Sequence, residues 1–140
     1  MNILITGHKG FIGYNLVKHL EPHHHVIGID IKDGNDVLDQ HLVESIFTNN
    51  HIDTVIHLAA TPGVGHSIEH SQEVLHNNII GFDTIVKTAC KHHVKHIIYA
   101  SSSSIYGDNG TPKSPYAVSK KTNELQASVY SNLYPDTRFT

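Results

Sequence analysis

The amino-acid sequence predicts an α/β domain built on a doubly wound parallel sheet of about five strands. Short apolar runs typical of buried strands alternate with longer segments of helical periodicity along the chain. A glycine-rich turn joins the first apolar run to the first helical segment. The 140 residues suffice for one core, so we expect one domain over residues 1–140.

The predicted elements follow one another as strand and helix in turn. We expect strands at 2–6, 26–30, 53–58, 96–101 and from 137 onward, and helices at 11–20, 39–49, 71–92 and 115–133. Alternation of this kind places helices on both faces of a parallel sheet. In the last helix Leu125, Val129 and Leu133 recur at every fourth position, and this row predicts the buried stripe of that helix.

The glycine-rich turn has the spacing G-x-x-G-x-x-G, one residue wider in its first gap than the dinucleotide fingerprint. Gly7 suits a tight turn, Gly10 a close backbone approach to a pyrophosphate, and Gly13 the contact between helix and strand. The helix that starts at Phe11 and Ile12 would donate its N–H groups to the phosphates. An ordinary strand-to-helix turn has similar glycines, but the flanking strand and helix are the setting that a Rossmann dinucleotide site requires.

An acidic residue, Asp30, ends the second predicted strand, about twenty residues beyond the glycines. A carboxylate at this place accepts hydrogen bonds from the adenosine ribose and repels a 2′-phosphate. The residue predicts NAD in preference to NADP, although as a single feature it is also a common turn former.

Small and polar residues follow the third and fourth predicted strands. Leu58, Ala59 and Ala60 close the third strand, and Ser101–Ser104 close the fourth. Ligands of doubly wound sheets bind beyond the carboxyl ends of the strands, where small residues let a cofactor approach. Taken alone, the serine run is equally well explained as a flexible polar loop.

Tyr116 and Lys120 lie four residues apart, so a helix places them on one face. A free phenol loses its proton only at about pH 10, and a cation a few ångströms away favours the phenolate. The pair can therefore exchange a proton with a sugar or alcohol hydroxyl. Many helices carry such a pair without function, and only its agreement with the other segments gives it weight.

Together these segments resemble the extended short-chain dehydrogenase/reductases, specifically the NAD-dependent nucleotide-sugar epimerases and dehydratases. Thr6–Gly13 resembles the T-G-x-x-G-F-I-G of that family, and His57–Ala60 resembles its H-x-A-A. Asn78 corresponds to the Asn of N-V-x-G, which helps to hold the active-site helix and strand. Tyr116 and Lys120 fill Y-x-x-x-K.

The resemblance implies a reaction and places the catalytic Ser/Thr of the family at Ser102. Tyr116 would take the proton of a sugar C4 hydroxyl while Ser102 hydrogen-bonds the same oxygen and Lys120 binds the nicotinamide ribose. Hydride removal by NAD, rotation of the ketosugar and hydride return to its other face would complete a C4 epimerisation. The implied cofactor residues are Gly7, Gly10, Phe11, Ile12, Gly13, Asp30, Asp36, Val37, Leu58, Ala59, Ala60, Asn78, Tyr116 and Lys120. The implied substrate residues are Ser67, Ser102 and Ser103.

Two of these assignments rest on short loops. Ser67 lies in a segment similar to the G-V-x-x-S loop of the family, and capping of the next helix explains it equally well. Asp36 and Val37 match the D-[VIL]-x-D turn that meets the adenine. Only the short polar segment 31–36 separates Asp30 from the approach to the next helix. We therefore expect an additional edge strand, which many members of the family have, to be absent.

The residues after Ser102 bear on the kind of reaction. Dehydratases of this family carry an acid one or two places after the catalytic Ser/Thr, where this chain has Ser103 and Ser104. A 4-epimerase is therefore favoured over a 4,6-dehydratase, and Tyr99–Asp108 looks closest to UDP-hexose or UDP-hexuronate 4-epimerases. A similarly shortened nucleotide-binding half occurs in nucleotide-sugar 4-ketoreductases, so a reductase is the main alternative.

The end of the chain, 137–140, resembles the start of the sixth strand of the family, after which a substrate-binding half follows. Three interpretations remain: a fragment of a longer enzyme, a compact enzyme completed by another subunit, or an NAD-binding module without catalysis. Ser102, Tyr116 and Lys120 argue against the last, because binding alone needs no proton-transfer tyrosine. An exposed final strand edge invites self-association, so we expect a homodimer.

Composition excludes several classes of partner. A net charge of −3 predicts no large basic face for nucleic acid. The one cysteine, Cys90, excludes an internal disulfide and fits a cytoplasmic protein. No segment approaches the roughly 18–20 apolar residues that span a bilayer, and we see no signal peptide. Histidines cluster at 23–25 and 92–96, but no carboxylate or thiol accompanies them at metal-ligand spacing, so we expect no metal.

Overall fold

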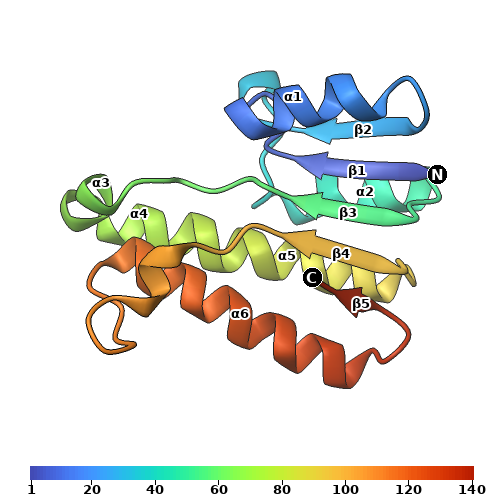
Figure 1. The fold of residues 1–140 in the computed structure, drawn as a ribbon. Helices are drawn as coiled ribbons and strands as arrows, with labels where there is room; N and C mark the ends of the chain where they lie inside the picture. Colours follow the sequence, from blue (N-terminus) through green and yellow to red (C-terminus); the bar gives the residue numbers. More distant parts are fainter.

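Five parallel strands form one sheet in the computed structural model, which describes residues 1–140 (Figure 1). The strands are β1 (Asn2–Thr6), β2 (His25–Ile29), β3 (Thr54–His57), β4 (His96–Tyr99) and β5 (Arg138–Phe139). Their order is β2-β1-β3-β4-β5, and every neighbouring pair is parallel. The predicted doubly wound parallel sheet is therefore confirmed. β2 lies at one edge, and the additional edge strand that we expected to be absent is absent.

The connections between the strands are mostly helical. The α-helices are α1 (Phe11–Leu20), α2 (Gln40–Asn49), α3 (Val64–Glu69), α4 (Ser71–Leu75), α5 (Gly81–Lys91) and α6 (Pro115–Leu133). The short helices are η1 (Ile31–Asp33), η2 (His76–Ile80) and η3 (Ser103–Tyr106). The predicted helix at 71–92 is α4, a π-helical turn in η2, and α5 in succession. α3 was not predicted, because only a loop was expected there.

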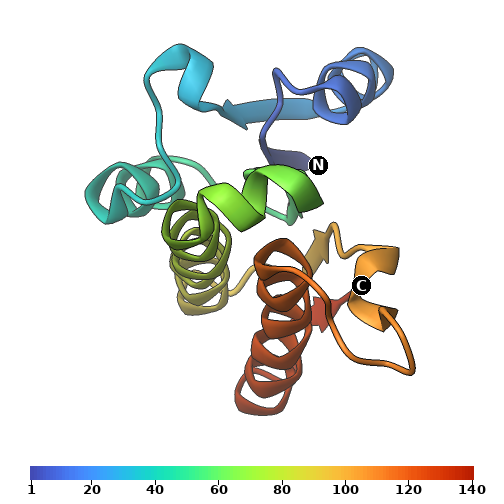
Figure 2. The ribbon, with the colours of Figure 1, turned by 90° about the vertical axis from the view of Figure 1, so that its left-hand side faces the viewer.

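The helices cover the two faces of the sheet unequally (Figure 2). The larger core lies between one face and the helices α2, α5 and α6, and it includes Leu4, Val55 and Ile97 from the strands. On the other face α1 alone packs on a smaller cluster formed by Ile3, Ile5 and Ile56. None of the helices has the length and apolar character that a bilayer crossing requires.

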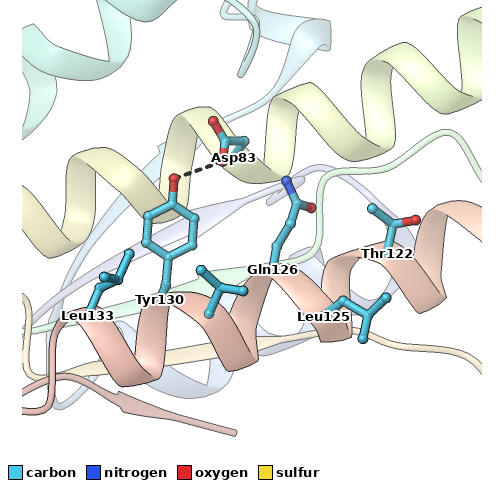
Figure 3. A pocket seen from close by; sticks show the side chains of 7 residues that line it. Asp83, Thr122, Leu125, Gln126, Tyr130 and Leu133 are labelled. Carbon is cyan, nitrogen blue, oxygen red and sulfur yellow. Dashed lines mark hydrogen bonds between the residues drawn. The ribbon is translucent and has the colours of Figure 1, made fainter.

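The predicted buried stripe of α6 is wrong. Leu125, Val129 and Leu133 are 61%, 56% and 65% exposed, and they line a groove of about 350 Å³ beside α5 (Figure 3). The buried residues of α6 are small or polar: Ala117, Ser119, Lys120, Asn123 and Ala127. Residues two apart on a helix point in nearly opposite directions, so a face that buries Ala127 exposes Leu125 and Val129.

Candidate functional site

The carboxyl ends of the strands lie along one edge of the sheet, because all five strands are parallel (Figure 1). The glycine-rich turn follows β1, Asp30 follows β2, and Leu58–Ala60 and Ser101–Ser104 follow β3 and β4. The chain passes from β1 to β2 on one side of it and then crosses to β3 on its other side. This reversal is where doubly wound sheets bind ligands.

The glycine-rich turn packs directly on the end of β3. Gly7 has a φ of +71°, and a Cβ there would lie 2.9 Å from the backbone nitrogen of Ala59. A Cβ at Gly13 would lie 2.2 Å from the carbonyl oxygen of Gly7, so this position in α1 accepts only glycine. Gly10 stands at the N-cap, where no side chain caps the helix. Phe11 and Ile12 are exposed beside it, and their N–H groups make no backbone hydrogen bond. An uncapped helix start of this kind suits a phosphate.

Thr6 and His57 tie the ends of β1 and β3 together. Thr6 Oγ1 accepts a hydrogen bond from the N–H of Ala59 at 3.1 Å and lies 2.8 Å from His57 Nδ1. Burial lowers the pKa of His57 to about 3, and the charge of Lys120 adds to this effect. His57 is therefore neutral, and the Thr6 hydroxyl can donate to it. The two side chains hold Ala59 beside Gly7 of the glycine-rich turn.

Asp30 holds the segments on either side of it. Its Oδ2 accepts the N–H of Lys9 at 2.8 Å, and its Oδ1 accepts the N–H of Lys32 at 2.9 Å. Burial acts to raise the pKa of Asp30, but these two backbone donors together with His8 and the charge of Lys32 outweigh it, and the pKa lies below its ordinary value. Asp30 is thus ionised and in place at the end of β2, and each carboxylate oxygen can accept a further hydrogen bond.

Asp36 and Val37 lie in the turn that leads to α2. Asp36 Oδ1 accepts the N–H of Leu38 at 2.9 Å, and Val37 packs against the larger core. Val37 also meets α5, since a Cβ at Gly81 would lie 2.8 Å from its Cγ2. Both residues stabilise this turn, and their assignment to the cofactor stays a prediction.

Asn78 joins three segments from within the π-helical turn. Its Oδ1 accepts the N–H of Thr61 at 2.7 Å, and its Nδ2 donates to the Thr61 carbonyl and to Ser119 Oγ at 3.1 and 3.0 Å. Its own carbonyl accepts from Asn123 at 2.9 Å. Asn78 is buried and uses its amide group to hold α6 and the segment after β3, and its assignment to the cofactor stays a prediction.

Tyr116 and Lys120 lie in the first turns of α6, which begins with a Ser114 cap and Pro115. Lys120 is buried and its Nζ donates to the carbonyl of Ala100 at 2.9 Å, which brings it to the end of β4. Burial lowers the pKa of Lys120 to about 8. Tyr116 is half-buried, and its carbonyl accepts from Ser119 at 2.7 Å. Lys120 therefore anchors the helix to the end of β4 one turn beyond the tyrosine.

The predicted serines differ in their surroundings. Ser102 is half-buried, its Oγ lies 2.8 Å from Ser104 Oγ, and the helix η3 that follows it packs against α6. Ser103 is exposed. Ser67 is completely buried inside α3 and donates to the carbonyl of Val64 at 2.7 Å, so it does not cap the next helix, and its assignment to the substrate stays a prediction.

Sequence reasoning missed several residues of this edge. Thr6 and His57 were seen only as parts of motifs, and Ser119 was not singled out. Whether a polar side chain is buried depends on partners far along the chain. The local spacing of residues does not reveal those partners. The sequence signal that was available is the placement of Ser119 between Tyr116 and Lys120.

The fold and this edge have the features of a dinucleotide-binding α/β domain. The chain belongs to the NAD dependent epimerase/dehydratase family, which matches residues 3–140. Protein CapI of Staphylococcus aureus is 38% identical over 169 residues, covering 96% of this chain and 51% of that protein. A UDP-glucose 4-epimerase of Halalkalibacterium halodurans is 35% identical over 152 residues, covering 99% of this chain and 43% of that protein.

Solved structures agree with the fold. A UDP-glucose 4-epimerase of Thermotoga maritima with UDP-glucose has a TM-score of 0.92 at 28% identity, covering 99% of this chain and 53% of that one. One from Bifidobacterium longum in complex with NAD⁺ and UDP has a TM-score of 0.89 at 27% identity, covering 99% of this chain and 51% of that one. The chain thus spans about half the length of these relatives. The 169-residue alignment also exceeds the 140 residues of this chain, so that relative has insertions which this chain lacks.

Proposed function

We propose that this chain is the NAD-binding part of a UDP-sugar 4-epimerase acting on a UDP-hexose or UDP-hexuronate. The observation that carries the proposal is that the start of α1 and the Lys120 side chain lie at the same edge of the sheet. The uncapped start of α1 lies against the end of β3, and Lys120 reaches the end of β4, which pairs directly with β3. A cofactor bound across β1 and β3 therefore lies beside the residues proposed for proton transfer.

The residues at the strand ends fit NAD. The pyrophosphate has the free N–H groups of Phe11 and Ile12, and Gly10 at the N-cap has no side chain to hinder its approach. Asp30 is ionised at the place of the adenosine ribose. When bound, NAD supplies a hydride acceptor that can return the hydride.

The chain's own residues would handle the proton. Tyr116 takes the proton of the sugar C4 hydroxyl, and Ser102 donates a hydrogen bond to the same oxygen as it becomes a ketone. Lys120 provides the neighbouring positive charge. Ser104, whose hydroxyl lies 2.8 Å from that of Ser102, has no carboxylate with which to eliminate water, and this supports epimerisation over 4,6-dehydration.

Two other functions compete with this proposal. The sheet ends at β2 without a further edge strand, and this short half is the observation that supports a nucleotide-sugar 4-ketoreductase. An NAD-binding module without catalysis remains the alternative from a different class, because the chain spans about half the length of the relatives. Remote parts of a substrate help to orient its reacting centre, so a missing half would reduce turnover.

The test is titration calorimetry of the purified chain with NAD, followed by NMR of C4 configuration with UDP-glucose, UDP-galactose and the UDP-hexuronates. We expect NAD to bind and at least one sugar to invert at C4. Reduction of a 4-ketosugar without inversion would support the reductase. Binding without any conversion would support the NAD-binding module, and lack of NAD binding would contradict the proposal.

We also propose that the working protein is a homodimer that covers the α5/α6 groove. The apolar row Leu125, Val129 and Leu133 is exposed along α6, and the only charged group in the groove, Asp83, already accepts the Tyr130 hydroxyl at 2.8 Å (Figure 3). A second copy related by a two-fold axis would set its own row into this groove. The open edge of β5 is a further place for self-association.

We expect Val129→Glu to convert the dimer to a monomer, because it places a charge in an apolar interface. Sedimentation velocity over a concentration series measures this. Ser131→Glu is the matched control, since Ser131 is exposed on the opposite side of α6. A monomer at all concentrations in the unchanged chain, or equal dissociation of both variants, would contradict the proposal.

A further inference from the structure

Asp33 forms an ion pair with Lys9 and contacts His8, the two residues between Gly7 and Gly10 in the glycine-rich turn. It lies in η1, directly beyond the end of β2, and its carboxylate pairs with Lys9 Nζ. His8 Nε2 lies 3.1 Å from the other oxygen, Asp33 Oδ2. One carboxylate thus holds both side chains between Gly7 and Gly10.

The position of His8 is set by the sheet below it. A Cβ at Gly28 would lie 2.5 Å from His8 Nδ1, so the ring occupies the space that only a glycine in β2 leaves. His8 Nδ1 is buried without a partner, and Nε2 is the nitrogen that faces Asp33. The packing of β2 therefore holds the His8 ring in place beside Asp33.

The same cluster surrounds Asp30. The N–H groups of Lys9 and Lys32 both donate to the Asp30 carboxylate, and Lys32 Nζ donates to the Lys9 carbonyl at 3.1 Å. Two lysines and two aspartates are gathered here beside His8, and the charges of the lysines and aspartates sum to zero. A 2′-phosphate is a dianion that needs surplus positive charge. Asp33 offsets the charge of Lys9, the residue whose N–H donates to Asp30.

We propose that Asp33 is a second determinant of cofactor specificity, acting with Asp30. It holds Lys9 and His8 away from the adenosine ribose, so the chain selects NAD. Without this carboxylate, Lys9 is free to pair with a 2′-phosphate, and NADP is accepted. The inference rests on the proposed dinucleotide binding, but not on any sugar substrate.

Titration calorimetry of NAD and NADP at low salt tests the role of Asp33. We expect the unchanged chain to prefer NAD, and Asp33→Asn to raise NADP affinity on the order of tenfold while NAD affinity stays within about twofold. The gain should shrink with added NaCl, because the freed cation is exposed to solvent. Asp33→Glu should keep the preference for NAD.

Two further variants separate the freed lysine from a general charge effect. Lys9→Met in the Asp33→Asn background should remove the gain. Asp136→Asn removes the same charge from an exposed residue in the turn before β5 and should leave both affinities unchanged. An unchanged NADP affinity in Asp33→Asn, an equal gain in Asp136→Asn, or a gain that survives Lys9→Met would overturn the inference while leaving the proposed function intact. Failure of the unchanged chain to bind NAD would overturn both.

Discussion

Tyr116→Phe is expected to lower the rate of sugar oxidation by on the order of 10²- to 10⁴-fold, because it removes the proposed proton acceptor and little else. Tyr116 is half-buried, and its carbonyl bond to Ser119 does not depend on the phenol. NAD affinity should therefore stay within about twofold. The measurement is the absorbance of reduced nicotinamide in a single turnover, with the NAD-bound chain in excess over a UDP-sugar. This signal reports the oxidation of the sugar even where the full cycle is slow.

The matched control for this substitution lies on the same helix. Tyr134 is also half-buried, at the end of α6 distant from the strand ends, and Tyr134→Phe should leave the rate unchanged. Equal rates in Tyr116→Phe and the unchanged chain would refute the role of Tyr116 in proton transfer.

Lys120→Met is expected to abolish turnover and to stabilise the fold at pH 7. Burial lowers the pKa of Lys120 from 10.5 to about 8, so keeping the ammonium buried opposes folding. The shift corresponds to roughly 3 kcal/mol. Loss of the hydrogen bond to the Ala100 carbonyl offsets part of this, and we expect a net gain of about 1–2 kcal/mol in the free energy of unfolding. Urea denaturation at pH 7 measures it.

The pH dependence identifies the cause of that gain. Between pH 8 and pH 10.5 the unfolded chain holds a proton on Lys120 that the folded chain has lost, so rising pH stabilises the unchanged protein through this group. The advantage of Lys120→Met should therefore shrink across this window. Lys121→Met is the control, because Lys121 is exposed and pairs only with Glu124, and it should show neither effect. A destabilised Lys120→Met at pH 7 would show that the ammonium contributes to the fold.

Much of the fold could be predicted because it follows from local pattern. The apolar runs and the helical periodicity predicted every strand and the long helices to within a few residues, and the glycine spacing located the turn after β1. The α4–α5 segment shows the limit. The π-helical turn at Asn78 is maintained by bonds to Thr61 and Ser119, which local periodicity does not reveal.

The candidate site shows the same division. Motifs located Tyr116, Lys120 and Ser102, and the structure places Lys120 at the end of β4. The motifs did not show that Asn78 bonds to Thr61 and Ser119 or that Ser67 is buried. Nor did they show that Asp33 pairs with Lys9 and His8, because these residues meet only when β2 is laid beside β1.

The sequence by itself determined the class of fold, the glycine-rich turn and the residues available for proton transfer, since each depends on neighbours within a few positions. Only the tertiary structure decided which face of α6 is buried. On the buried face, Ser119, Lys120 and Asn123 are hydrogen-bonded to Asn78 and Ala100. The opposite face of α6, with Leu125, Val129 and Leu133, is therefore turned outward. Apolar periodicity describes one helix alone, whereas burial depends on what the neighbouring elements offer to each of its faces.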